Sequence, residues 1–153
     1  MNYIGEISCN FWGTYFEVFD RGFDKALYEK SPKFISTQKK LLGVVKYETN
    51  IMGECPRYFS SEIYLKDEVY KLENVRPEWN EAMDCYCLNF YGRVKKASAR
   101  NFQMYSPDDP ENILFQHGKF AKDEFNIDFR EPFNYLNAFA LGLISIGRKR
   151  IVS

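Results

Sequence analysis

The chain has 153 residues, of which 45% are hydrophobic, 27% charged and 18% aromatic. Disordered proteins are poor in aromatic residues, so this composition excludes a largely disordered chain and predicts a single folded domain over residues 1–153. The 21 basic and 21 acidic residues cancel, which excludes the overall basic excess of most nucleic-acid-binding proteins. We therefore expect no specific nucleic-acid partner, and any anion site must be a local patch.

The N-terminus and the cysteines point to a cytoplasmic protein. Glu6 interrupts the first residues before the apolar run of a signal peptide can form, and no apolar stretch reaches the ~18 residues of a membrane span. The cysteines do not have the spacing of a zinc site or of a thioredoxin-type pair. We expect reduced thiols, no metal and no cofactor. The four positions are Cys9, Cys55, Cys85 and Cys87.

The first two thirds of the chain predict short strands. Residues 14–19 alternate, with Phe16 and Val18 on one face. Residues 74–83 contain Pro77 and several charges, so we expect a loop there. Short strands separated by turns are typical of an antiparallel barrel or sandwich. Further strands are expected at residues 41–49, 58–65, 69–72, 85–90, 92–97, 101–105, 113–116, 119–121 and 124–129.

The segment from Pro132 to Gly147 has no charged residue and predicts a helix, with Pro132 near its first turn. Its apolar residues occur on all sides, and a helix that is apolar all round is buried all round. About 14 residues at ~1.5 Å each span ~21 Å, which is too short to cross a membrane. A β-barrel wrapped around the helix is the simplest enclosure. It would bury the side chains of Leu136, Phe139, Ala140, Leu143 and Ile144.

Residues 90–103 read FYGRVKKASARNFQ and resemble the signature of the tubby and tubby-like family. Other stretches that resemble family motifs follow in the same order through nearly the whole chain. The resemblance implies a mainly-β fold, a tubby-type antiparallel barrel around a buried C-terminal helix, which agrees with the pattern described above. These stretches are residues 10–16, 47–53, 56–57, 77–80, 109–110, 116–119 and 138–140.

The resemblance also implies a function: a non-enzymatic module that binds phosphatidylinositol bisphosphate at the plasma membrane, with full-length members carrying membrane-protein cargo into cilia. This chain departs from the family in three ways, one of which is that residues 149–153 replace the family's terminal motif. It lacks the family's first strands and a basic segment, so we expect an incomplete barrel whose open edge can pair with another chain. Ser8 occupies the position of a phosphate-binding arginine, and serine lacks the charged, bidentate donors that phosphate favours.

The remaining candidate for an anion site is a basic stretch within the signature: Arg93, Lys95, Lys96 and Arg100. On a strand, Arg93 and Lys95 would share one face and Lys96 the other. The alternative interpretation is a solvated strand edge, where lysines deter pairing. A degenerate barrel that acts as a protein-interaction domain, without lipid binding, is the alternative function. His117 is expected to have a packing role, because the chain has no nucleophile-elbow motif that could use it.

Overall fold

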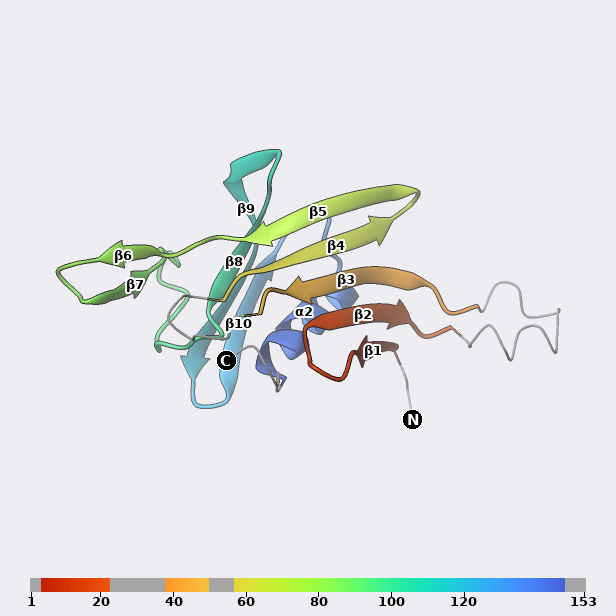
Figure 1. Ribbon diagram of the computed structural model, residues 1–153, viewed down its shortest axis with the longest axis horizontal. Coiled ribbons are helices and arrows are strands. Elements are labelled where there is room, and N and C mark those ends of the chain that lie inside the picture. Colours follow the sequence, from red (N-terminus) through yellow and green to blue (C-terminus); the bar gives the residue numbers. More distant parts are fainter. Residues whose placement is uncertain (1–3, 23–37, 50–56, 148–153) are drawn as a thin grey trace.

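The computed structural model describes residues 4–22, 38–49 and 57–147 (Figure 1). In this part of the chain, eight strands form one antiparallel sheet, and β6 (Glu78–Asn80) and β7 (Cys85–Cys87) form a separate hairpin. Helix α2 (Tyr135–Ile146) follows the last strand. The strands of the large sheet, in spatial order, are β1 (Gly5–Cys9), β2 (Tyr15–Asp20), β3 (Leu41–Tyr47), β4 (Phe59–Leu65), β5 (Glu68–Asn74), β8 (Phe102–Ser106), β9 (Asp109–Ala121) and β10 (Glu124–Phe129).

The large sheet curves around one side of α2. The helix contacts β2 and β3 near one edge of the sheet and β10 at the other (Figure 1). The edge strands β1 and β10 do not pair with each other within the described residues, so the sheet stays open. The prediction of an antiparallel, incomplete barrel with one C-terminal helix is confirmed.

The core lies between the sheet and α2, and aromatic rings form its centre. Phe102 packs edge-on against Phe59 with 4.9 Å between the ring centroids, and it stacks on Phe115 at 5.4 Å. Phe115 in turn contacts Phe133, just before the helix, at 4.9 Å. Offset and edge-on pairs of this kind add stability beyond the area they bury. The rings therefore tie β4, β8 and β9 to the start of α2.

Helix α2 is capped at its N-terminus by Asn134, whose side chain accepts hydrogen bonds from the backbone N–H groups of Leu136 and Asn137. This arrangement satisfies two of the N–H groups that have no partner within the helix. The helix lies close to β10 at Gly142, where an added Cβ would be 2.7 Å from the Cδ1 of Ile127. None of the helical structure in the described residues has the length and hydropathy needed to cross a bilayer.

Five residues of the helix were predicted to be buried, and the prediction is wrong for two of them. Ala140 and Ile144 are buried, and Leu136 is half-buried. Phe139 is 51% exposed and Leu143 is 44% exposed. The open sheet covers one side of α2 and leaves the other to solvent. The apolar residues on all sides of the helix predicted that strands would surround it, and the described strands do not.

Several strand predictions also differ from the structure. Residues 92–97 form an irregular loop, and residues 74–83, predicted to be a loop, contain β6. The two strands expected around Gly118 are one continuous strand, β9. Strand β1 was not predicted, and β7 ends at Cys87 although the expected strand ran to residue 90. The parts of predictions that fall on residues 50–56, including Cys55, and on 148–153 lie outside the described residues.

Candidate anion-binding site

The predicted basic residues all lie on one loop, residues 88–101, which joins β7 to β8 and is called the basic loop here. Its backbone is held against β9: the N–H groups of Lys95 and Lys96 both donate to the carbonyl of Lys119, at 3.0 and 3.1 Å. The amide of Asn101 donates to the carbonyl of Lys96 at 2.9 Å and accepts from the N–H of Lys119 at 2.8 Å. These bonds replace the ladder of a strand, which is why the predicted strand is absent.

A buried glutamine pair holds the first part of the basic loop. The side-chain amide of Gln103 donates to the side chain of Gln116 at 2.7 Å and to the carbonyl of Asn89 at 2.9 Å. Both glutamines are buried, and buried polar groups need such partners. The amide of Gln116 also reaches the carbonyl of Phe90, at 3.5 Å. Gln103 of the signature stretch and Gln116 of β9 therefore hold the start of the basic loop together.

Gly118 lets the basic loop lie directly on β9. A Cβ at this position would be 2.2 Å from the Cγ2 of Val94, much closer than carbon atoms can approach. The glycine that suggested a strand break instead marks a close contact between a strand and a loop, which is a recognised role of glycine within strands.

One of the four predicted cations is neutralised. Arg93 makes a bidentate pair with Asp128 on β10, with Nε–Oδ2 and Nη2–Oδ1 distances of 2.9 Å each. Hydrogen bonding from Arg93 lowers the pKa of the Asp128 carboxyl, so the pair is ionised at neutral pH. Arg93 therefore fixes the loop to the sheet and is largely unavailable to an external anion.

The other three cations are exposed. Within the described residues, no carboxylate lies within the 4.0 Å ion-pair distance of Lys95, Lys96 or Arg100. Because the segment is not a strand, the predicted division of these side chains between two faces does not apply. The loop thus presents uncompensated positive charge from a backbone that is held at several points.

Ser8 lies on the outer face of β1, in acidic surroundings. Its cross-strand partner is Glu17, and Glu6 lies two residues away on the same face. Glu6 pairs with Lys39 at 2.8 Å. Among the described residues, the neighbours of Ser8 on this face therefore include two carboxylates, of which Glu6 is paired with Lys39.

His117 is fully buried and serves packing, as predicted. Its ring lies between Phe102 and Phe125, with centroid distances of 5.3 and 4.7 Å, and its Nδ1 is 2.8 Å from the carbonyl of Arg100. Since a carbonyl only accepts, Nδ1 carries the proton. Burial lowers the pKa of His117, which keeps the ring neutral. The ring holds the backbone at the end of the basic loop.

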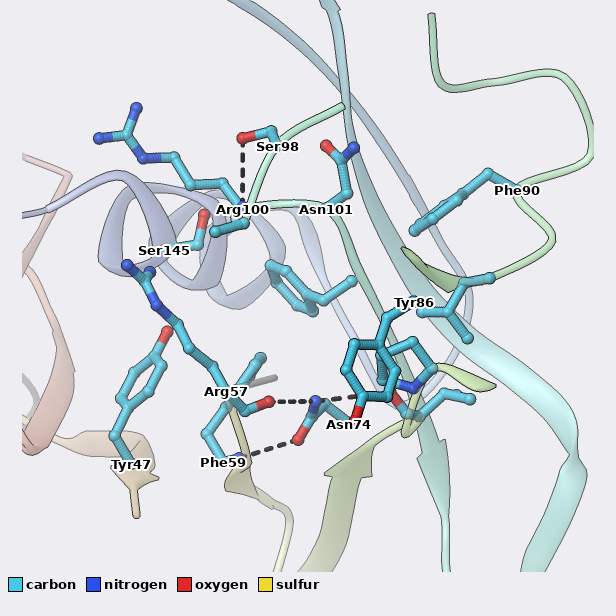
Figure 2. Close-up of a pocket in the computed structure, with 15 residues that line it drawn as sticks. Tyr47, Arg57, Phe59, Asn74, Tyr86, Phe90, Ser98, Arg100, Asn101 and Ser145 are labelled. Carbon is cyan, nitrogen blue, oxygen red and sulfur yellow. Dashed lines mark hydrogen bonds between the residues drawn. The ribbon is translucent and has the colours of Figure 1, made fainter. Parts of the chain in front are cut away.

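Beside the basic loop lies a cavity of about 440 Å³, which we call the Arg57 pocket (Figure 2). It is bordered by the residues before β4, by the end of the basic loop and by Ser145 of α2. Sequence reasoning did not find it, because its residues come from segments far apart in the chain. The side chains that matter for its chemistry are Tyr47, Arg57, Phe59, Ser98, Arg100 and Phe102.

Comparison of the sequence with known proteins identifies the family of this chain. A sequence model of the Tub family matches residues 58–148, which include the basic loop, β8 to β10 and α2. The chain belongs to the Tub family. Mouse Tubby-related protein 2 and human Tubby-related protein 1 are 32% and 33% identical to this Tub domain over 97% of its length. Protein king tubby of Drosophila sechellia is 31% identical over 96%.

This Tub domain spans about a third of the length of these relatives: 31%, 32% and 38% of the three proteins, respectively. The family match extends over the residues that build the basic loop and the strand beneath it. Arg57 lies one residue before the matched segment. The basic loop is therefore a feature of the family-matched part of the chain, whereas the Arg57 pocket is only partly so.

Proposed function

We propose that this Tub domain is a non-enzymatic module that binds anionic, phosphoinositide-bearing membrane surfaces peripherally. The observation that carries the proposal is the basic loop, which presents Lys95, Lys96 and Arg100 without an acidic partner in the described residues. Each lysine or arginine near an anionic bilayer contributes about 1 kcal/mol. Three together favour the membrane-bound state by about 3 kcal/mol, or about two orders of magnitude.

The way the basic loop is held supports this role. Ordering a flexible loop on a membrane would cost conformational entropy, about 1–2 kcal/mol for each residue fixed. Here Lys119, Asn101 and the glutamine pair already hold the loop backbone before any ligand binds. Little of the electrostatic gain is then lost on ordering the backbone.

The surroundings of the histidine favour binding over catalysis. A general base must reach the proton that it removes. His117 is enclosed between two phenyl rings, and its Nδ1 is bonded to the Arg100 carbonyl. The side chain is therefore not placed to exchange protons with a substrate.

Vesicle flotation with three lipid compositions tests the proposal. Neutral phosphatidylcholine vesicles are compared with vesicles that also carry phosphatidylinositol bisphosphate and with phosphatidylserine vesicles of matched surface charge. We expect binding to both anionic surfaces, release by added salt because exposed charges are screened, and no binding to the neutral surface. Equal recovery with neutral and anionic vesicles, or recovery with neither, would show that the proposal is wrong.

A protein-interaction domain is the second candidate, and the exposed side of α2 favours it. Tyr135, Phe139 and Leu143 are 85%, 51% and 44% exposed, and a group of exposed apolar side chains is a typical binding surface. This candidate predicts no vesicle binding, together with concentration-dependent association in light scattering. The double substitution Phe139→Glu/Leu143→Glu should abolish that association, and a wild-type protein that stays monomeric would count against it.

A further inference from the structure

The Arg57 pocket contains a charged donor that has no hydrogen-bond partner among the described residues. The Nε of Arg57 is buried, and no group within the described residues accepts a hydrogen bond from it. Burying a charged donor without an acceptor is unfavourable, so such a group in a folded protein needs an explanation. In Figure 2 the guanidinium of Arg57 points past Tyr47 toward Ser145, along one wall of the pocket.

The backbone around Arg57 is fixed by Asn74, a buried residue at the end of β5. The side-chain oxygen of Asn74 accepts from the N–H of Phe59 at 2.8 Å, and its amide donates to the carbonyl of Arg57 at 3.0 Å (Figure 2). These two bonds hold the chain on both sides of Tyr58. The start of the Arg57 side chain is therefore positioned before any ligand arrives.

The charged residues among the described lining of the pocket are both arginines. Arg100 is a second arginine among the residues that line it, and no aspartate or glutamate is among the described residues that line it. The hydroxyl of Ser98 accepts from the backbone N–H of Arg100 at 3.2 Å, which leaves its own proton to donate. Arginine side chains and hydroxyl groups are donors that suit the oxygens of a carboxylate or a phosphate.

The other walls are flat and apolar. The rings of Tyr47 and Phe59 stack at 4.7 Å, and Phe102 packs edge-on against Phe59. Burial raises the pKa of the Tyr47 phenol, so its hydroxyl is neutral at physiological pH. Pockets of about 300–1,000 Å³ with apolar walls and a few polar groups are typical of small-molecule sites, and the volume of about 440 Å³ falls in this range.

We propose that the Arg57 pocket binds a small organic anion, with a carboxylate or phosphate on Arg57 and Arg100 and an apolar body against Tyr47, Phe59 and Phe102. This site shares Arg100 with the basic loop but does not use Lys95 or Lys96. A bare phosphate would satisfy the guanidinium groups but leave the aromatic walls in contact with water. A neutral hydrocarbon would cover the walls but leave the Nε of Arg57 without an acceptor.

Calorimetric titration with five soluble probes tests this proposal. Naphthoate and naphthyl phosphate carry both an anionic group and an apolar ring system. Naphthalene methanol has the ring system without the charge, and inorganic phosphate has the charge without the ring system. The soluble inositol phosphate headgroup tests whether the pocket recognises a phosphoinositide lipid through its headgroup. We expect the first two to bind at least about tenfold more tightly than the other three. Equal affinity for the neutral and anionic naphthalenes would overturn the proposal, as would tightest binding of the inositol headgroup.

Variants locate the site. We expect Arg57→Gln to weaken naphthoate binding at least about tenfold and Arg57→Lys, which keeps the charge but loses the fork of donors, to fall between it and the wild type. Lys95→Gln/Lys96→Gln serves as the control and should bind naphthoate as the wild type does, although its vesicle binding is weakened. If Arg57→Gln loses stability in a thermal melt yet keeps its naphthoate affinity, Arg57 has only a structural role.

Because loss of folding would also abolish binding, a wild-type measurement accompanies the variants. The ¹⁵N–¹H resonance of the Arg57 Nε should shift on addition of naphthoate and not on addition of naphthalene methanol. A resonance that does not respond to naphthoate means that the anion does not interact with this donor, and the proposal then fails even if every variant unfolds.

Discussion

The half-buried helix gives the sharpest test of the architecture. Ile144 and Leu143 are neighbours on α2, and both are branched aliphatic residues of equal size. Ile144 is 2% exposed and faces the sheet, whereas Leu143 is 44% exposed. Replacing each with alanine removes the same number of carbon atoms and favours helix formation at both positions. The pair therefore isolates burial as the variable.

The expected magnitudes differ clearly. A buried isoleucine truncated to alanine typically costs about 2–5 kcal/mol, because transfer energy is lost and a cavity remains. Full burial of a leucine side chain is worth about 1.5–3 kcal/mol. Leu143 is only partly covered, and its solvent side leaves no cavity, so we expect Leu143→Ala to cost about 1 kcal/mol or less.

Urea unfolding followed by circular dichroism measures both variants. With a slope of about 2 kcal/mol per molar urea, Ile144→Ala should lower the midpoint by about 1–2.5 M and Leu143→Ala by about 0.5 M or less. Equal losses of 2 kcal/mol or more at both positions would mean that α2 is enclosed on all sides in solution. That result would refute the open-sheet arrangement.

Two further predictions concern the support of the basic loop. Gly118→Ala should destabilise the domain by about 1–3 kcal/mol, because its Cβ would overlap Val94. Adding Val94→Ala should recover part of this loss. A Gly118→Ala variant as stable as the wild type would contradict the close contact. Burial lowers the pKa of His117 below its ordinary value of 6.5, so as pH falls below 6.5 the unfolded chain binds a proton that the folded protein does not. Wild-type stability should then fall by up to about 1.4 kcal/mol per pH unit relative to His117→Phe, and parallel curves for the two proteins would show that the ring is not buried as described.

Local pattern was enough to predict the strands that have one buried face. Residues 124–129 were expected as a strand and form β10 with the same bounds. In β2, Phe16 and Val18 are buried as the alternation predicted. The uncharged helix after Pro132 could also be predicted, because its signals lie in the local sequence and not in distant partners.

The rest depends on contacts that sequence spacing does not reveal. Residues 92–97 have a strand-like composition, yet their backbone groups bond to Lys119 and to the side chains of Asn101 and Asn126. The exposure of Phe139 depends on how far the sheet closes, which the helix sequence does not encode. The buried Nε of Arg57 has no signal in a single sequence, since the cavity forms only when the residues before β4, the basic loop and α2 come together.

The claim that the basic loop is the membrane-binding surface is tested most directly by comparing two double variants that remove equal charge. Lys95→Gln/Lys96→Gln changes the basic loop, and Lys66→Gln/Lys71→Gln changes exposed lysines of β5 and of the turn before it. At about 1 kcal/mol per lysine, the first should weaken binding to phosphatidylinositol bisphosphate vesicles about 30-fold while the second leaves it within about threefold of the wild type. Equal weakening by both variants, or none by the first, would contradict the proposed site.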